Sequence, residues 1–164
     1  MPLRSDWSKD RCSIARALEV IGDPWAMVVL RNAFQGSRRY EDFRRSCEAA
    51  DNVLSKRLKD LVAAGLLQRS PYSDGGRIRQ EYLLTQAGAD LLPVLNGLLL
   101  WGERHRPHED PGVHMQLIHS GCGAVTDTAE RCSSCGEFME PGDVAWRKSW
   151  RDADTPLVGA PPPR

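Results

Sequence analysis

The sequence predicts a mainly helical fold with one small β-hairpin, followed by a short β segment rich in cysteine. Apolar residues recur at helical spacing, three or four positions apart, through most of the first 105 residues. In that stretch, two segments with the pattern of β-strands lie on either side of a turn sequence, Ser73–Gly76. Further on, three of the five cysteines crowd into residues 122–135, a density that favours metal binding.

The composition is that of a globular protein in which basic and acidic residues balance. The chain has 164 residues, a net charge of zero and 41% hydrophobic residues. This length suits one domain with a small appendage and requires no disulfide framework. No run of about 18 apolar residues is present, so we expect no transmembrane helix and no membrane association. Residues 1–9 lack the apolar core of a secretory signal, so we expect a cytoplasmic protein.

Three helices are predicted before residue 47. The segment Cys12–Ile21 carries its apolar residues on one face. Pro24 suits the first position of the next helix, Trp25–Phe34, which is apolar nearly all round and should lie in the core. Gly36 ends that helix, and a short helix over Tyr40–Ser46 follows.

A fourth helix and a β-hairpin come next. The helix begins near Asp51 and ends at Gly65, with leucines along its buried face. Two short strands, Leu66–Ser70 and Gln80–Leu84, flank the hairpin loop Pro71–Arg77. Two helices joined by a short turn and followed by a basic hairpin are typical of a winged helix-turn-helix.

One long helix should close this part of the chain. Thr85 suits its N-cap, the helix runs to about His105, and Pro93 should kink it. Apolar side chains surround almost the whole circumference of this helix. Because a single domain rarely covers a helix that is apolar all round, we expect a partner chain to cover one face.

The winged-helix arrangement predicts a double-stranded DNA partner. Residues 31–79 hold 11 basic and 6 acidic residues, a local net charge of +5 in a neutral chain. The helix from Asp51 would be the recognition helix in the major groove, where Asn52 suits an adenine edge and Lys56 a guanine edge. The expected DNA-binding residues are Arg38, Arg39, Arg44, Asn52, Ser55, Lys56, Lys59, Arg77 and Arg79.

These residues divide into two kinds. The arginines before the recognition helix suit phosphates, which fix register without reading sequence, and those of the hairpin suit the minor groove or the backbone. The alternative is a solvated surface of mixed charge. Arg57 alternates with buried leucines and could simply pair with Asp60, and Lys59 could be an ordinary solvated lysine.

Several short motifs follow one another between Cys12 and Arg106. They are Cys12–Leu18 with Trp25, Asn52–Leu58 with Leu61 and Gly65–Leu66, Tyr82–Thr85 with Gly88, and Leu92–Leu95 with Trp101–Gly102. In this order and spacing they resemble the HxlR-type winged-helix regulators, which are MarR-like. The resemblance implies a homodimer built from the first and last helices, with half-sites about one helical turn apart. Ser13 replaces the usual Pro of the family, and Ala50 replaces the usual capping Ser, so Asp51 would cap instead.

The resemblance also implies where a signal could act. Cys12 matches the N-terminal cysteine that senses oxidants or electrophiles in some members, and Arg11 and Arg16 could stabilise its thiolate. The alternative is a small side chain buried in the dimer interface. A small-molecule effector could lie between the two long helices, lined by Trp25, Trp101 and leucines, but dry core packing is the preferred explanation for these residues.

The cysteine-rich segment predicts a zinc site. His119 and Cys122, and likewise Cys132 and Cys135, are separated by two residues, and a Gly follows each pair. Such a gap lets a tight turn present two ligands to one ion, and four ligands make a closed, structural Cys3His site. A Cys132–Cys135 or mixed disulfide and free thiols are the alternatives, and His114 is a weaker substitute for His119.

The chain is therefore expected to divide at a Pro-containing linker. Residues 1–106 would form the winged helix-turn-helix and dimerisation domain, and residues 107–114 the linker. Residues 115–150 would form a zinc-ribbon-like segment. Residues 151–164, rich in Pro and small side chains, predict a disordered tail.

The function expected from these features is that of a dimeric, sequence-specific DNA-binding transcriptional regulator. Repression by promoter occupancy in response to a small-molecule or redox signal is the default. No deaminase motif, nucleophile elbow, phosphate loop or dinucleotide fingerprint is present, so no enzyme is expected. The alternative is a protein-interaction module that uses the winged helix and the zinc ribbon without specific DNA binding.

Overall fold

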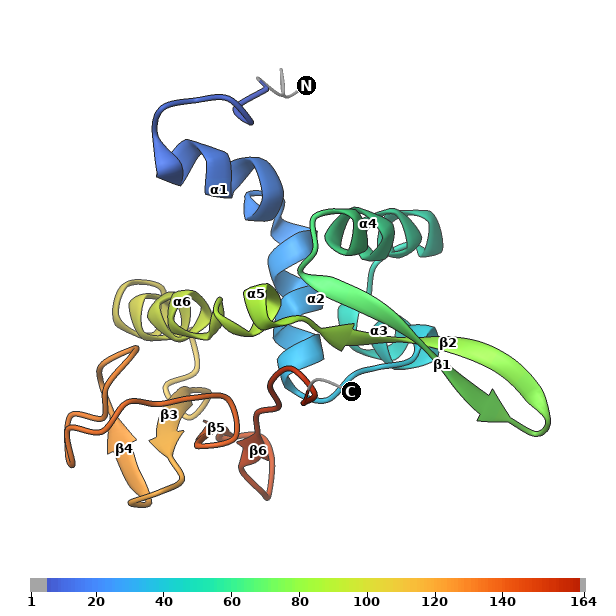
Figure 1. Ribbon diagram of the computed structural model, residues 1–164. Helices are drawn as coiled ribbons and strands as arrows, with labels where there is room; N and C mark the ends of the chain where they lie inside the picture. The colour runs from blue at the N-terminus through green and yellow to red at the C-terminus, as the bar shows by residue number, and fades with distance from the viewer. Residues whose placement is uncertain (1–5, 163–164) are drawn as a thin grey trace.

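Helices and a hairpin form the first part of the chain, and a small β-sheet packs beside them (Figure 1). The computed structural model describes residues 6–162. Within them, no helix has the length and the apolar character that crossing a membrane requires. The elements are α1 (Ser13–Ile21), α2 (Pro24–Phe34), α3 (Tyr40–Cys47), α4 (Asp51–Ala63), β1 (Leu67–Asp74), β2 (Arg77–Leu84), α5 (Gln86–Ala89), α6 (Leu92–His105), β3 (Met115–His119), β4 (Ala124–Thr126), β5 (Val144–Lys148) and β6 (Thr155–Pro156).

Helix α2 is the centre of the core, as its sequence predicts. The Asp23 carboxylate caps it by accepting a hydrogen bond from the Trp25 N–H at 2.9 Å, and Pro24 occupies the first turn. Leu30 and Phe34 are fully buried. The start of α2 is tied to α4 through Arg57, whose guanidinium pairs with both Asp23 and Asp60. The expected pairing of Arg57 with Asp60 is confirmed, so this arginine has a structural role.

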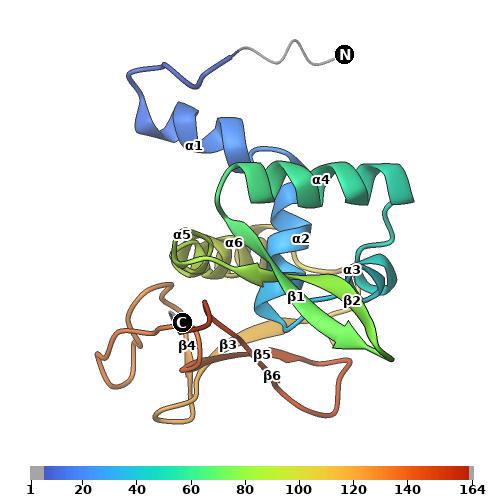
Figure 2. The ribbon, with the colours of Figure 1, turned by 45° about the vertical axis from the view of Figure 1, so that its right-hand side comes forward.

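Helices α3 and α4 form the helix-turn-helix, and the hairpin β1–β2 is the wing (Figure 2). The two strands pair from Leu67 opposite Leu84 to Asp74 opposite Arg77. The wing is longer than the sequence predicts, because Gly75 and Gly76 make a two-residue turn with φ angles of 55° and 82°. The expected loop over 71–77 is therefore mostly strand.

The predicted last helix is two helices. Thr85 caps the short α5, accepting a hydrogen bond from the Gly88 N–H at 3.1 Å, and the chain leaves the helix at Asp90. Pro93 lies in the first turn of α6, where a missing N–H removes no helical hydrogen bond. The prediction of a kink at Pro93 was therefore wrong, because the proline starts a new helix.

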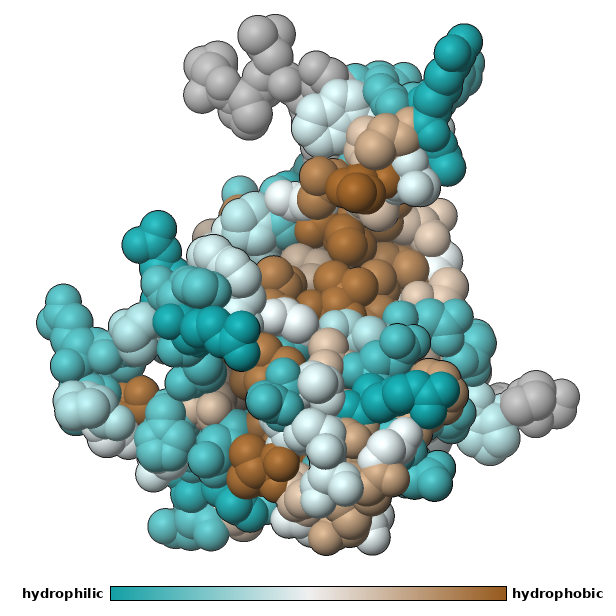
Figure 3. Space-filling model, turned by 90° about the vertical axis from the view of Figure 1, so that its left-hand side faces the viewer, coloured by the Kyte–Doolittle hydropathy of each residue, from teal (hydrophilic) through white to brown (hydrophobic). Residues whose placement is uncertain are grey.

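Helices α1 and α6 expose apolar side chains. No residue of α1 is buried, and Ile14 is 69% exposed. On α6, Leu98 is 52% and Trp101 55% exposed. Figure 3 views the molecule from the left-hand side of Figure 1 and shows apolar side chains gathered in one patch on that side. This agrees with the expectation that the last helix has more apolar surface than its own chain covers.

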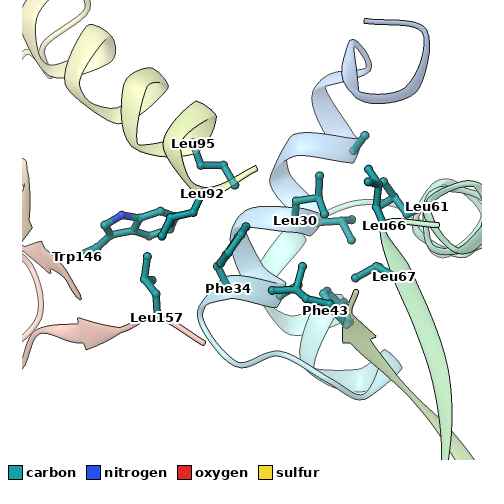
Figure 4. Packing of buried hydrophobic residues seen from close by; sticks show 14 of the residues in the cluster. Leu30, Phe34, Phe43, Leu61, Leu66, Leu67, Leu92, Leu95, Trp146 and Leu157 are labelled. Atoms are coloured by element: carbon teal, nitrogen blue, oxygen red, sulfur yellow. The ribbon is translucent and has the colours of Figure 1, made fainter. Parts of the chain in front are cut away.

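The C-terminal sheet has the strand order β4-β3-β5-β6 and is antiparallel. Its large buried side chain, Trp146, packs with Leu157 against α6 and the end of α2 (Figure 4). The indole N–H of Trp146 donates to the side-chain oxygen of Asn96 at 3.1 Å, and the Asn96 amide donates to the Ala129 carbonyl at 3.1 Å. Asn96 is fully buried, so one α6 residue satisfies polar groups from two parts of the C-terminal segment.

The chain beyond residue 150 differs from the disordered tail that its composition predicts. Strand β6 pairs with β5, Leu157 is buried, and the Val158 N–H donates to the Phe34 carbonyl at 2.8 Å. The apolar Leu157 and the backbone pairing order this stretch despite its prolines. Residues 163 and 164 of the expected tail lie outside the described residues.

Candidate DNA-binding surface and metal site

The exposed side of α4 carries the side chains that the sequence assigns to base contacts. Asn52, Lys56 and Lys59 are exposed, whereas the leucines of the helix face the core. Ser55 is half-buried, and its hydroxyl donates to the Tyr40 hydroxyl at 3.3 Å. Ser55 is therefore less available to a ligand than the other three side chains.

The beginning of α4 is held by contacts with α3. Ala50 precedes the helix without a side-chain cap, and Asp51 is its first residue. The Asp51 carboxylate lies 3.1 Å from Arg44 Nε, and the Tyr40 hydroxyl donates to the Asp51 carbonyl at 3.2 Å. A carboxylate suits the positive end of a helix, and Arg44 offsets the charge that would repel a DNA phosphate. Sequence reasoning missed Tyr40, since an aromatic residue in an apolar pattern gives no signal for its hydroxyl.

Side-chain contacts join the wing to α3. The Arg39 guanidinium lies over the Tyr72 ring, 4.5 Å from its centroid. Arg79 lies 3.3 Å from the Asp74 carboxylate and 3.8 Å from that of Glu41. Arg77 is exposed beside the turn of the wing. These contacts hold the wing beside the start of α3.

The remaining predicted contacts lie on the same elements. Arg38 comes just before α3, and the N–H groups of Arg38 and Arg39 donate to the Asp42 carboxylate at 3.4 and 3.0 Å. Lys56 pairs with Asp60 at 2.9 Å. All nine predicted side chains therefore belong to α3, α4, the wing or the residue pair that precedes α3 (Figure 2).

Four side chains of the C-terminal segment form one cluster. One ligand atom each of His119, Cys122, Cys132 and Cys135 lies within 4.8 Å of all the others. His119 Nδ1 lies 3.2 Å from the Cys122 sulfur and 3.3 Å from the Cys135 sulfur, and the Cys122 and Cys132 sulfurs are 3.6 Å apart. Around tetrahedral zinc, neighbouring N and S ligands are roughly 3.5–3.8 Å apart. The donor set and its spacing can therefore hold a metal ion, and His119, not His114, completes the set.

Glycines shape the two turns that present these ligands. Gly123 and Gly136 follow Cys122 and Cys135 with φ angles of 71° and 78°, a left-handed conformation that favours glycine. A Cβ on Gly121 would lie 3.0 Å from His119 Nε2. The two Gly residues noted in the sequence are thus needed for backbone conformation, and Gly121 leaves room beside the imidazole.

The thiols of the cluster differ in acidity. Backbone N–H groups, foremost that of Cys135 and then that of Ser134, lower the pKa of Cys132 to about 6. The Glu137 N–H lowers the pKa of Cys135, but desolvation and the neighbouring sulfurs outweigh it and raise that pKa overall. Thiolate is the form that binds metal, so the Cys132 thiol is better prepared to bind than the Cys135 thiol. The five cysteines form no disulfide, and the disulfide alternative gains no support.

The two remaining cysteines lie in different surroundings. Cys12 is exposed directly before α1, and its N–H donates to the Asp10 carboxylate at 2.7 Å. The Arg16 guanidinium donates to the carbonyls of Asp10 and Arg11. Cys47 is buried, its sulfur accepts a hydrogen bond from the Asn32 amide at 3.0 Å, and burial raises its pKa.

Comparison with known proteins identifies relatives for most of the chain. The model of the HxlR-like helix-turn-helix family matches residues 20–110. An HTH-type transcriptional regulator of Mycobacterium tuberculosis is 40% identical over 132 residues, which are 80% of this chain and 82% of the relative. The HTH-type regulator YybR of Bacillus subtilis is 31% identical over 100 residues, 60% of this chain and 79% of that protein. The first 110 residues are about two thirds of the chain, so the mycobacterial match extends into the C-terminal segment.

Solved structures agree with these relatives. The crystal structure of PA1607, described as a candidate transcription factor, has a TM-score of 0.69 and 32% identity, and the match covers 85% of this chain and 96% of that one. The redox regulator HypR in its reduced form has a TM-score of 0.53 and 30% identity, over 58% of this chain and 94% of HypR. The family model and the mycobacterial relative together show that the chain belongs to the HxlR-like helix-turn-helix family of transcriptional regulators.

Proposed function

We propose that the protein is a homodimeric, sequence-specific DNA-binding regulator that represses transcription by occupying a promoter. One observation carries the proposal: α4 and the wing present basic and amide side chains, and α3 links the two, through the Arg39–Tyr72 and Arg79–Glu41 contacts to the wing and the Arg44–Asp51 pair to α4. Held in this way, the recognition helix and the wing would meet one duplex together. This agrees with the transcriptional regulators among the relatives.

The DNA-binding side chains fall into those that contact bases and those that contact the DNA backbone or the minor groove. Asn52 and Lys56 would read base edges in the major groove, assisted by Ser55 and Lys59. The arginines at α3 and in the wing would contact phosphates or the minor groove, which fixes the register of the protein on the duplex. In the free protein, Lys56 and Arg79 pair with carboxylates, so binding exchanges these exposed ion pairs for contacts with DNA.

The first test of this function is a DNA titration. Fluorescence anisotropy with DNA from upstream of the protein's own gene should give binding at least about 10³-fold tighter than binding to scrambled DNA, with a steep salt dependence. Equal affinity for both duplexes across a panel of candidate operators would contradict specific recognition. It would instead favour a winged helix that binds another protein.

The second copy in the dimer would cover the apolar patch on α1 and α6. Ile14 and Leu18 of α1 and Leu98 and Trp101 of α6 are all exposed in the single chain. Exposed patches of this kind mark interfaces in soluble proteins. A two-fold axis would bring the same patch of each chain together and place one recognition helix on each half-site.

Replacing Leu98 by glutamate should convert the dimer into a monomer. Two carboxylates would then have to be desolvated within one apolar interface, at a cost of several kcal/mol. Sedimentation velocity gives the mass. Val125→Glu, which adds the same charge at an exposed apolar residue of β4, is the matched control and should stay dimeric. An unchanged mass for the Leu98 variant would contradict the assignment of this interface.

The Cys3His cluster is best explained as a structural zinc site. Its four ligands leave no position for substrate, which is typical of a structural site. The signal is proposed to be redox or a small molecule. A redox signal is supported by the likeness to HypR and by the exposure of Cys12 next to the proposed dimer face.

A further inference from the structure

A cleft lies between the helix-turn-helix and the C-terminal sheet, away from the ligand cluster. The end of α2, the end of α3 and the β5–β6 connection line it, and its volume is about 880 Å³. Sites for small organic molecules commonly have volumes of about 300–1,000 Å³. The elements that line it are distant in sequence, so the fold builds this cleft only when the C-terminal segment packs in place.

The cleft concentrates positive charge. Arg45 of α3 lines it and pairs with Asp42 at 2.7 Å. Three further basic side chains line it, from α2, β5 and the turn that follows β5: Arg31, Lys148 and Arg151. Glu48 and Asp152 also line it. Among residues 6–162, neither of these carboxylates is within ion-pair distance of any of the three basic side chains. The lining therefore has more basic than acidic side chains, and Arg31, Lys148 and Arg151 have no ion-pair partner among the described residues.

Two of the basic side chains are partly removed from water. Arg31 Nε is buried and has no hydrogen-bond partner among the described residues. Lys148 donates to the side-chain oxygen of Gln35. Burial lowers the pKa of Lys148, and the nearby charges of Arg31 and Arg151 lower it further. Positive charges that are partly removed from water cost free energy, and an anionic group brought by a ligand would offset that cost.

The remaining wall offers an aromatic surface. Trp150 lines the cleft, lies two residues after Lys148 and is 51% exposed. An indole beside guanidinium and ammonium groups suits a ligand with an apolar or aromatic part next to an anionic group. A DNA backbone would contact fully exposed lysine and arginine tips, whereas Lys148 is half-buried within the cleft.

We propose that this cleft binds a small organic molecule that carries a carboxylate or phosphate group beside an apolar or aromatic part. Arg31 and Lys148 hold the anionic group, Arg151 closes over it, and Trp150 contacts the apolar part. The ligand thereby bridges α2 and the C-terminal sheet. This binding does not depend on the proposed DNA function, because the site lies outside the nine residues assigned to DNA.

Titration of the full-length protein with benzoate, inorganic phosphate and benzamide tests the proposal. Chemical shifts of backbone amides, followed by NMR at constant ionic strength, should saturate with benzoate or phosphate at millimolar concentrations and map to the cleft. Tighter binding of benzoate indicates a carboxylate ligand, and tighter binding of phosphate indicates a phosphate ligand. Neutral benzamide should bind at least about tenfold more weakly than benzoate. Equal binding of benzamide and benzoate would overturn the proposal.

Variants locate the site. Lys148→Gln and the more exposed Arg151→Gln should each weaken binding of the anion by about fivefold or more. Arg106→Gln removes the same charge at an exposed residue after α6 and should leave the affinity unchanged. Wild-type affinity in both cleft variants would overturn the proposal. So would variants that retain anion binding but lose affinity for DNA, because the cleft would then be a DNA contact.

Discussion

Replacing Cys132 by serine should remove the bound metal and unfold the C-terminal sheet. Its sulfur lies 3.6 Å from that of Cys122 and is buried with 2% exposure, so a serine at this position replaces a ligand at the centre of the cluster. Structural zinc stabilises small metal-binding segments by roughly 10–16 kcal/mol, and a hydroxyl is a poor substitute for thiolate. The wild type should bind one zinc ion per chain, and the variant should bind none after dialysis.

The consequence should extend beyond the segment. Trp146 and Leu157 pack against α6 and Phe34, so unfolding of the sheet exposes part of the shared core. We expect tryptophan emission to shift to longer wavelength and the thermal transition to move to lower temperature. Metal analysis by mass spectrometry, fluorescence and a melting curve measure the three effects.

The matched control is Cys12→Ser, which removes an exposed thiol outside the cluster. It should retain its zinc, its emission spectrum and its melting temperature. A Cys132 variant that still holds one zinc ion per chain would contradict the ligand assignment. A wild-type protein that acquires no zinc when purified with zinc present would contradict the metal site itself.

Periodicity and spacing predicted the features of this molecule that depend on neighbouring residues. The four helices up to Ala63 begin and end within two residues of their predicted bounds, because apolar spacing and caps such as Asp23 act locally. The four ligands were predicted from two gaps of two residues, since each gap forms its own turn. The assignment of individual DNA contacts stays a prediction.

Features that depend on distant contacts could not be predicted in this way. In the sequence, Asn96 is a polar residue within an apolar helical stretch. In the structure, its side-chain oxygen accepts the hydrogen bond of the Trp146 indole N–H, fifty positions away in the chain. Leu157 lies in a Pro-rich stretch whose order comes from strand pairing and from Phe34. The cleft between α2 and β5 needs residues 31 and 148 together, and no local pattern joins them.

Replacing Lys56 and Arg79 by alanine together should strongly weaken specific DNA binding. Lys56 lies on the exposed side of the recognition helix, and Arg79 lies on the wing beside Glu41 of α3. Loss of a base contact costs about 1–3 kcal/mol, and loss of a phosphate contact lowers the slope of log K against log salt by about 1. We expect at least about a 30-fold loss of operator affinity, by the 1.4 kcal/mol that corresponds to each factor of ten.

The two substitutions should differ in the kind of loss when made singly. Lys56→Ala should reduce the preference for operator over scrambled DNA, because base contacts carry specificity. Arg79→Ala should weaken binding to both duplexes alike and flatten the salt dependence. Anisotropy titrations at several salt concentrations separate these outcomes, and sedimentation verifies that both variants remain dimeric.

A double variant of Arg104 and Arg106 is the matched control, since it removes two positive charges at the exposed end of α6. This control should bind the operator with wild-type affinity, because its two charges lie outside the proposed DNA-binding surface. Wild-type affinity of the Lys56 and Arg79 double variant would contradict the assignment of this surface. An equal loss in the control would mean that the charge of the whole chain, and not a recognition surface, governs the affinity.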